Sequence, residues 1–410
     1  MNNLFIGLIY NDTEIKWLKE KSKCGFEAAA NNFQWNFING LTDNLNGNLD
    51  IFSFLPIGTW PFNFKKIFIK TKYYNILKGG KLYQFGFINL FIFKELYRSI
   101  LLFCELIKWA KKNSSGGTIY VYSLYTPFLV SMFFFLKFTN KFQYCLIVPD
   151  LMGEYGVLQP WFTFLGLKQR LDSYFQVWLS KKPDCYVLLT KDMVYPLGIT
   201  KKPYVVIECL VPKDRLLMGE LENKTIINDS EKRIILYYGS LNIEYGITTL
   251  LNAFLKIKNL NYELWICGPE RQSDYILQFC KKDSRIKYLG FLMKEELLKT
   301  QELATLLINP RPNIGEYTKY SFPSKTAEYI LSGKAVIMFK LDGVPNEYYD
   351  YVFLMSSFNS DIMALEIDQI CSLSLSEINK FGVKAMQFIV NNKNANIQTK
   401  KILDLISLQK

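Results

Sequence analysis

The stretch from residue 306 to residue 351 constrains the fold more than any other part of the chain. A short apolar run at residues 306–308 is followed by Pro310 and Pro312, which lack the N–H group that a central strand needs. A second apolar run, at residues 335–339, is short enough for a buried parallel strand. A helix is expected between the two runs, so the stretch predicts one βαβ unit of an open parallel sheet.

The junction between the loop and the helix of this unit is suited to an anion. Pro323 fits the first turn of a helix and Gly333 fits its end, because glycine accepts left-handed backbone angles cheaply. Free amides and the helix dipole favour a phosphate there. Lys325 would add a full charge, and Glu328, on the same side of the helix as Ser324, could accept the hydroxyls of a ribose. The alternative is a surface ion pair between Lys325 and Glu328, worth less than about 1 kcal/mol.

The length and composition indicate a two-domain globular protein. The chain has 410 residues, which favours two domains of about 200 residues each, and half of the residues are apolar. No apolar run reaches the ~18 residues of a membrane span, and the N-terminal stretch lacks the basic segment of a signal peptide. The eight cysteines include no C-x-x-C pair, which favours reduced thiols in a cytoplasmic protein.

The chain contains no histidine. This excludes Ser-His-Asp and Cys-His catalysis, histidine-ligated zinc and an imidazole base. No D-x-D pattern is present to hold a divalent cation on a diphosphate. We therefore expect side chains and helix ends, with no metal or other cofactor, to neutralise the anion that this protein handles.

Positive charge is concentrated in the first half of the chain. Residues 1–210 contain 24 Lys and Arg against 14 Asp and Glu, a net charge of +10, whereas residues 211–410 contain 25 against 23, a net charge of +2. A basic half indicates either an anionic partner or a lysine-rich solvated surface. Residues 65–112 mix lysines with aromatic residues, and we expect helices there whose basic rim, at residues 65–81, lies against anionic lipid. Nucleic acid is the less favoured partner, because no nucleic-acid-binding motif accompanies the charge.

Apolar runs in the first half predict a series of parallel strands, at residues 4–10, 119–123, 144–148, 186–189 and 204–207. Polar residues in the loops after such strands usually enter the ligand site of an α/β domain. The loop after the first strand leads to Asn31 and Asn32, which could hold sugar hydroxyls or, as we favour, cap and solvate a short helix. Asp150 and Glu154 follow the strand at residues 144–148 and are the acidic residues best placed in this half to contact a substrate hydroxyl.

A second series of strands and helices begins at residue 234. Further strands are predicted at residues 234–238, 263–267, 286–289 and 352–355, with helices at residues 246–256 and 295–301. The polar run at residues 212–233 is the expected connection between domains. The sequence therefore predicts an α/β fold with parallel, doubly wound sheets. Its expected parts are domains at residues 1–210 and 211–385 and a C-terminal helix, within residues 386–410, that crosses back onto the first domain.

Motifs of the second half follow one another as in a known family. They are Tyr238-Gly239-Ser240-Leu241 with Gly246-Ile247, Ile266-Cys267-Gly268, Tyr288-Leu289-Gly290, Phe322-Pro323-Ser324-Lys325 through Glu328 and Gly333, and Gly343-Val344-Pro345-Asn346-Glu347. This pattern resembles the donor domain of family 4 glycosyltransferases, in the form found in bacterial surface-polysaccharide clusters. The resemblance implies the GT-B architecture, in which two Rossmann-like domains face each other across a cleft.

The resemblance also implies roles for individual residues. Glu328 matches the second glutamate of the family's pair and would hold the ribose. The first glutamate falls at Tyr320, so Glu316 from the same loop is the candidate for contact with the sugar. The implied donor-binding residues are Gly239, Ser240, Gly268, Tyr320, Ser321, Ser324, Lys325 and Glu328, the implied catalytic residues are Lys325, Arg311, Glu316 and Asp150, and the acceptor-binding candidates are Asn31, Asn32 and Glu154.

The diphosphate is expected to meet different cations here than in the family. Ser240 and Tyr245 stand where the family often carries an Arg and a Lys, and Lys325 and Arg311 are the candidates to replace that charge. By analogy the reaction retains the anomeric configuration, through front-side attack assisted by the leaving diphosphate. The alternative is a catalytically inactive binding or scaffold subunit of the same fold.

The implied partners are a nucleotide-sugar donor and a polyprenyl-linked or oligosaccharide acceptor of surface polysaccharide synthesis, such as that of capsule or exopolysaccharide. The basic half would then hold a cytoplasmic protein peripherally at the inner face of the plasma membrane, and no nucleic acid is expected.

Overall fold

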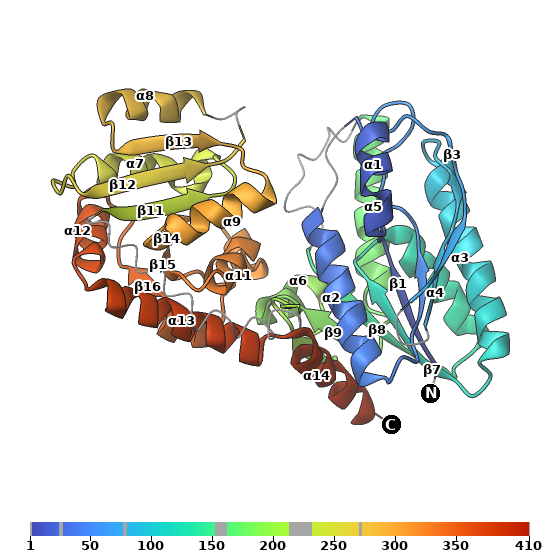
Figure 1. The fold of residues 1–410 in the computed structure, drawn as a ribbon. Helices are drawn as coiled ribbons and strands as arrows, with labels where there is room; N and C mark the ends of the chain where they lie inside the picture. The colour runs from blue at the N-terminus through green and yellow to red at the C-terminus, as the bar shows by residue number, and fades with distance from the viewer. Residues whose placement is uncertain are drawn as a thin grey trace. The chain divides into compact units, whose positions relative to one another are not determined.

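A computed structural model describes residues 2–23, 28–76, 80–151, 162–212, 232–269 and 273–409. The chain divides into two compact units (Figure 1). Unit 1 comprises Met1–Pro212 with Ala395–Lys410, and unit 2 comprises Lys213–Asn394. Each unit has its own mainly parallel sheet, so the predicted α/β class with two doubly wound sheets is confirmed.

Unit 1 is built on an eight-stranded sheet with the order β10-β9-β8-β7-β1-β2-β5-β4. The strands are β1 (Asn2–Gly7), β2 (Asp50–Ser53), β4 (Lys72–Asn75), β5 (Lys81–Gln84), β7 (Gly117–Tyr122), β8 (Phe142–Val148), β9 (Cys185–Leu188) and β10 (Tyr204–Val206). All neighbours pair in parallel except β4, an antiparallel edge strand on β5. The chain leaves β1 toward β2 and later returns to β7 on the other side of β1, so the switch point of the sheet lies between β1 and β7.

Helices cover both faces of this sheet. Helix α2 (Ala28–Asn44) lies on one face, and α3 (Phe93–Lys112), α4 (Thr126–Phe138) and α5 (Phe164–Leu179) lie on the other. The last helix, α14 (Ala395–Ser407), packs against α2, as Figure 1 shows at the red end of the chain. The side-chain amide of Asn44 secures this contact by donating to the carbonyl oxygen of Asn396 and to Oγ1 of Thr399, at 2.8 and 2.9 Å.

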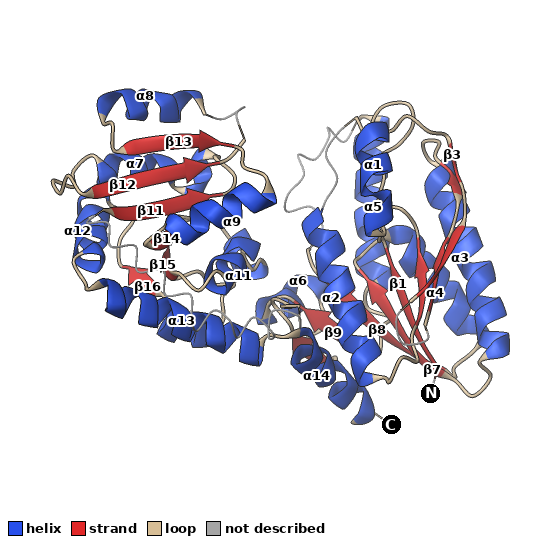
Figure 2. Ribbon diagram, viewed as in Figure 1, coloured by secondary structure: helices blue, strands red, loops and turns tan. Residues whose placement is uncertain are grey.

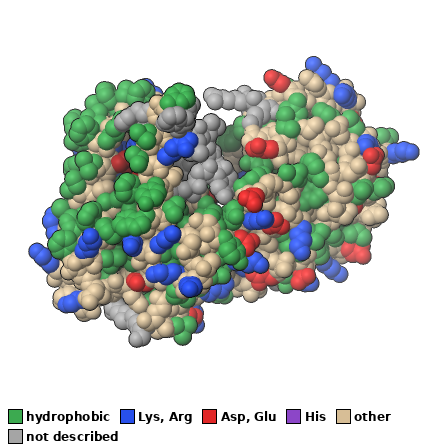
Figure 3. Space-filling view, turned by 180° about the vertical axis from the view of Figure 1, so that it is seen from behind, with side chains coloured by type: hydrophobic (Ala, Val, Ile, Leu, Met, Phe, Trp, Pro, Cys, Tyr) green, Lys and Arg blue, Asp and Glu red, His purple; other side chains and the backbone are tan. Residues whose placement is uncertain are grey.

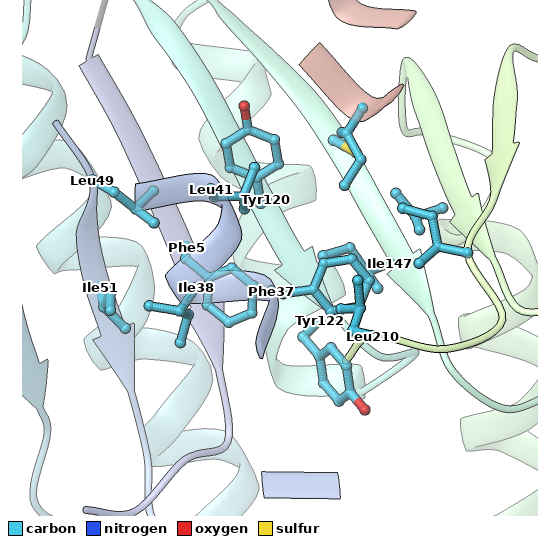
Figure 4. Close-up of a cluster of buried hydrophobic side chains, with 14 of the residues drawn as sticks. Phe5, Phe37, Ile38, Leu41, Leu49, Ile51, Tyr120, Tyr122, Ile147 and Leu210 are labelled. Atoms are coloured by element: carbon cyan, nitrogen blue, oxygen red, sulfur yellow. The ribbon is translucent and has the colours of Figure 1, made fainter. Parts of the chain in front are cut away.

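The core of unit 1 fills the space between the sheet and the α2–α14 pair. Figure 4 shows Phe5 and Tyr120 from the strands facing Phe37 and Leu41 from α2. Ile402 from α14 is fully buried in the same cluster. The C-terminal segment therefore contributes core side chains to unit 1 and does more than lie on its surface.

Unit 2 has a six-stranded parallel sheet with the order β13-β12-β11-β14-β15-β16. Its strands are β11 (Arg233–Tyr238), β12 (Tyr262–Cys267), β13 (Ile286–Gly290), β14 (Leu306–Asn309), β15 (Ala335–Phe339) and β16 (Phe353–Met355). Counted along the chain this is the order 3-2-1-4-5-6 of a Rossmann fold, with the switch point between β11 and β14. Figure 2 shows helices on both sides of the sheet. They are α7 (Ile247–Phe254), α8 (Asp274–Lys282), α9 (Lys294–Leu303), α11 (Ser324–Leu331), α12 (Ser360–Cys371) and α13 (Leu375–Asn392).

A buried carboxylate ties together three strands of this sheet. Glu263 in β12 accepts hydrogen bonds from Lys232, directly before β11, and from Lys287 in β13, at 2.8 and 2.6 Å. Trp265 donates a third, at 2.8 Å. Burial would raise the pKa of Glu263, but these donors outweigh it and lower the pKa to about 2. The ionised carboxylate therefore stabilises unit 2 above its unfolded pKa, and this stabilisation is lost as the pH falls through about 2.

Glu263→Gln should lower the free energy of unfolding at pH 7 by about 1–2 kcal/mol, a value that allows for the half-exposed lysines. The difference from the wild type should shrink as the pH falls from 4.5 toward about 2, which urea unfolding at a series of pH values would show. Glu295→Gln, on the exposed surface of α9, is the matched control. A loss that does not depend on pH would contradict the ionic account.

One expectation for the chain's layout is wrong in part. Of the helices expected at residues 65–112 the structure has α3, whereas the described residues between 65 and 88 carry β3 (Phe68–Ile69), β4, β5 and β6 (Phe87–Ile88). Lys72, in the predicted basic rim, forms a 2.7 Å ion pair with the buried Glu14. The C-terminal helix expected to cross back onto the first domain corresponds to α14, which belongs to unit 1 and begins at Ala395, because α13 of unit 2 continues past residue 385 to Asn392.

No described helix is long and apolar enough to span a bilayer.

Candidate functional site

The switch point of the unit 2 sheet brings two loops together. β11 and β14 are neighbours, and their carboxyl ends lead into residues 239–246 and 310–323. The chain continues from β11 to one side of the sheet and from β14 to the other, which leaves room for a ligand beside both loops. The loop after β14 contains α10 (Tyr317–Tyr320) and leads into the first turn of α11.

A buried hydroxyl positions α11 against β11. Tyr329 in α11 donates to the carbonyl oxygen of Tyr238 at 2.8 Å and accepts from its N–H at 3.1 Å. β11 pairs with β14 only at Ile235 and Leu236, so the hydroxyl takes the place of a strand neighbour at Tyr238. Tyr329 is fully buried, which raises the pKa of its phenol. The first turn of α11 is therefore held beside the carboxyl end of β11.

The predicted pair of charges lies on this turn. Lys325 Nζ is 2.6 Å from Oε2 of Glu328, and the side chains are 40% and 45% exposed. The same ammonium lies 4.8 Å from the ring centroid of Tyr238. The ion pair of the alternative interpretation thus exists, but it is exposed enough to open for a ligand, because such pairs contribute less than about 1 kcal/mol.

Arg311, in the loop after β14, lies between two aromatic rings, one from each of the two loops. Its Cζ lies 5.6 Å from the ring centroid of Tyr245 and 5.1 Å from that of Tyr317. Its Nη2 is at the limit of a hydrogen bond to Oγ of Ser321, 3.5 Å, and its buried Nε has no hydrogen-bond partner among the residues that the structure describes. The guanidinium charge also opposes the rise that burial causes in the pKa of Tyr237. Arg311 is thus a cation held in place by stacking, with donor capacity left for an anion.

Two glycines allow the loops to approach this closely. Gly246 has φ +82°, and a Cβ there would lie 2.1 Å from the carbonyl oxygen of Pro310. A Cβ at Gly268 would lie 2.6 Å from the carbonyl oxygen of Gly239. Any larger residue would push the loop ends of β11, β12 and β14 apart.

The other donor-site candidates of unit 2 lie in the same loops. Ser240 is exposed, and its carbonyl oxygen accepts a hydrogen bond from Tyr237 at 2.5 Å. Ser321 is buried and donates to the carbonyl oxygen of Tyr317 at 3.0 Å, so its hydroxyl hydrogen is engaged. Ser324 is exposed at the start of α11. Glu316, directly before α10, is exposed, and Tyr320, the last residue of α10, is half-buried.

The candidates of unit 1 have different surroundings. The side-chain oxygen of Asn31 accepts from the N–H of Tyr10 at 2.9 Å, so this buried amide ties α2 to the loop after β1. Asn32 is exposed on α2, and Asp150 is exposed directly after β8. Glu154 lies outside the described residues.

Sequence reasoning missed the tyrosines that build the site. Tyr238, Tyr245, Tyr317 and Tyr329 contact Lys325, Arg311 or β11, yet none was proposed for its side chain. The signal available was position: Tyr238 ends an apolar strand and Tyr245 precedes the Gly246 turn. Within the described residues, no group of three or more Cys, Asp or Glu side chains could hold a metal ion.

Comparisons with known proteins match one family model and a set of similar folds. Residues 220–406 match the family model described as glycosyl transferases group 1. No curated protein matches the chain. A sucrose-phosphate synthase from Thermosynechococcus elongatus has a similar fold, with a TM-score of 0.62 at 14% identity over 100% of both chains.

Two further solved structures resemble the chain as closely. One is an α,α-trehalose-phosphate synthase from Burkholderia xenovorans in complex with glucose-6-phosphate, with a TM-score of 0.60 at 9% identity over 99% of this chain and 100% of that one. The other is described as trehalose-6-phosphate from E. coli bound with UDP-2-fluoro glucose, with a TM-score of 0.60 at 11% identity over 98% and 99%. At such identities these likenesses establish the fold alone.

Proposed function

We propose, from the group 1 glycosyl transferase domain at residues 220–406, that the chain transfers a sugar from a nucleotide-sugar donor with retention of configuration. One observation carries the proposal. Two cations lie at the switch point of the unit 2 sheet, Arg311 in the loop after β14 and Lys325 in the first turn of α11. Such a place suits the diphosphate of a nucleotide sugar.

The donor would engage residues that are now paired with one another. Lys325 would turn from Glu328 toward the diphosphate, since their ion pair is exposed. The released carboxylate of Glu328 would accept hydrogen bonds from the hydroxyls of the ribose. The first amides of α11, which have no partner within the helix, would bind phosphate oxygens.

Catalysis in this proposal is electrostatic. Negative charge builds on the diphosphate as the sugar leaves, and the fixed guanidinium of Arg311 and the ammonium of Lys325 stabilise it more in the transition state than in the ground state. The acceptor hydroxyl attacks from the side of the leaving group and passes its proton to the leaving oxygen. This route requires neither a carboxylate nucleophile nor a metal.

The acceptor we propose is a lipid-linked glycan of bacterial surface polysaccharide synthesis, met at the inner face of the plasma membrane. Its support is the net charge of +10 in residues 1–210. A sugar phosphate is the second candidate, because glucose-6-phosphate occupies a structure of similar fold. An inactive binding subunit is the remaining alternative, since Ser240, Tyr245 and Tyr320 stand where the family has charged residues.

A thermal-shift screen of UDP-, GDP-, ADP- and dTDP-sugars tests the donor site. The correct donor at a hundredfold excess over its Kd should raise the apparent stability by about 2.7 kcal/mol. Lys325→Ala should abolish most of this shift. Lys258→Ala, an exposed lysine between α7 and β12 at the opposite end of the sheet, should keep it.

The outcomes separate the alternatives. A shift in the wild type and in Lys258→Ala, lost in Lys325→Ala, supports the proposed site. Absence of a shift with every nucleotide sugar would move the interpretation to the inactive subunit. A shift without hydrolysis or transfer of the donor would do the same.

A further inference from the structure

Helix α5 turns apolar side chains away from its sheet. Leu167, Leu171, Tyr174 and Trp178 follow one another at intervals of four, three and four residues, which places them on one side of the helix. All four are exposed, Leu167 at 54% and Tyr174 at 70%. A helix of a globular domain normally turns such a stripe inward, so this one is available for a partner.

The stripe continues across the two neighbouring helices. Phe133 of α4 packs on Trp178 with ring centroids 5.0 Å apart, and its neighbour Phe134 is exposed. Phe138, 70% exposed at the end of α4, contacts Phe103 of α3 at 5.5 Å. α3 adds the exposed Phe93, Leu96 and Ile100. Figure 3 shows this broad field of hydrophobic side chains over the part of the molecule drawn on the left.

Lysines border the apolar field at one end. α3, α4 and α5 each precede a parallel strand, so their C-terminal ends lie at the same edge of the sheet. The lysines at these ends are Lys108, Lys111, Lys112, Lys137, Lys141, Lys181 and Lys182, all exposed. Lys137 Nζ lies 4.5 Å from the ring centroid of Phe133, and Lys182 Nζ lies 4.7 Å from that of Trp178. The acidic residues among them are Glu105, paired with Lys108, and Asp184, which accepts from the N–H of Tyr144.

We propose that this surface, called here the α3–α5 face, docks on an anionic phospholipid bilayer. Exposed rings next to lysine ammonium groups suit the boundary between headgroups and acyl chains, where the rings enter the apolar layer and the amines reach the phosphates. Each lysine near an anionic surface adds to the attraction.

The charge of the face argues against a second copy of the chain as its occupant. The cores of protein interfaces are depleted of lysine, and two copies of a face with this excess of lysines would repel each other. A lipid surface instead supplies the opposite charge together with an apolar layer. The inference extends the proposed function by naming the surface that would bring the chain to a lipid-linked acceptor, and it rests on that function only for this purpose.

Flotation of the full chain with vesicles tests the proposal. The protein should bind vesicles of phosphatidylglycerol and phosphatidylcholine, bind pure phosphatidylcholine at least tenfold more weakly, and lose affinity as salt rises. Phe138→Ala with Tyr174→Ala should lower the affinity for anionic vesicles about tenfold, as should Lys137→Glu with Lys182→Glu. These side chains are exposed, so the variants should keep the wild-type melting temperature.

The matched control is Phe62→Ala with Phe68→Ala. It removes two equally exposed rings of unit 1 that lie outside the face, Phe62 just before residues 65–81 and Phe68 within them. Loss of vesicle binding in this control alone, or a lipid-independent dimer that the face variants abolish, would overturn the proposal. The nucleotide-sugar shift of unit 2, measured without lipid, should be unchanged in the face variants, so failure of the lipid proposal and failure of the donor proposal are distinguishable.

Discussion

Arg311→Gln should lower kcat/KM for the nucleotide-sugar donor about a hundredfold. The guanidinium is already stacked between Tyr245 and Tyr317, so it is fixed before the reaction and costs little to reorganise when charge builds on the diphosphate. Its Nε, without a partner among the described residues, is a donor that a phosphate oxygen would satisfy. Initial rates of donor hydrolysis or transfer, with the donor that the thermal-shift screen identifies, measure the effect.

Two further variants control this result. Arg311→Lys keeps the charge but loses the planar fork, so it should recover only part of the rate. Arg285→Gln removes an arginine directly before β13, which pairs with Asp283 and lies over the ring of Phe254. It should lower stability and leave kcat/KM unchanged. If the folded Arg311→Gln variant had the wild-type kcat/KM, Arg311 would have no role in the reaction.

The sequence predicted unit 2 well because its strands are short apolar runs with sharp ends. The run at residues 335–339 is β15 to the residue, and the helix expected from Pro323 to Gly333 is α11, Ser324–Leu331. Proline, glycine and apolar residues act locally, so their positions report local structure without knowledge of the partner strands. The same signals placed Lys325 and Glu328 on the helix turn where the structure has them.

The tyrosines of the site depend on contacts far apart along the chain. The bond between Tyr329 and Tyr238 joins residues 91 positions apart, and it exists because the pairing of β11 with β14 stops at Leu236. The residue at which two strands stop pairing depends on where their following loops leave the sheet. No local sequence pattern encodes that position. For the same reason the rings around Arg311 come from two loops that only the folded sheet brings together.

Unit 1 shows how a local pattern can mislead. Lysines alternate with aromatic residues at residues 65–88, and we read the mixture as amphipathic helices. The structure uses it for short strands, with Tyr73 and Tyr83 packed across the antiparallel pair β4–β5 at 5.7 Å. The period-two alternation was present, but the runs were too short to be told from a helix without their partners. Lys72 likewise forms an ion pair with Glu14, 58 residues away in the sequence. The exposed apolar surface of unit 1 lies instead on α3, α4 and α5.

Tyr329→Phe should destabilise unit 2 by about 2–4 kcal/mol, because it leaves both the N–H and the carbonyl oxygen of Tyr238 buried without their partner. Without this hydroxyl, the contacts that remain between α11 and β11 are the packing of the two rings, at a centroid distance of 4.6 Å, and Lys325 over the ring of Tyr238. Lys325 and the first amides of α11 would then be less well fixed, so the stability shift with the nucleotide sugar should shrink as well. Urea unfolding and the ligand titration measure the two effects.

Tyr186→Phe in unit 1 is the chemically matched control. Its buried hydroxyl makes one hydrogen bond, to the carbonyl oxygen of Ser180 at 2.7 Å, so the variant should lose about 1 kcal/mol and bind the nucleotide sugar like the wild type. If the two variants lost equal stability and both kept the ligand shift, Tyr329 would be an ordinary core residue. If instead only Tyr329→Phe weakened binding, the hydroxyl that completes β11 would also be what holds the donor site in its binding geometry. The stability of unit 2 and the placement of the first turn of α11 at the donor site would then both depend on the hydroxyl oxygen of Tyr329.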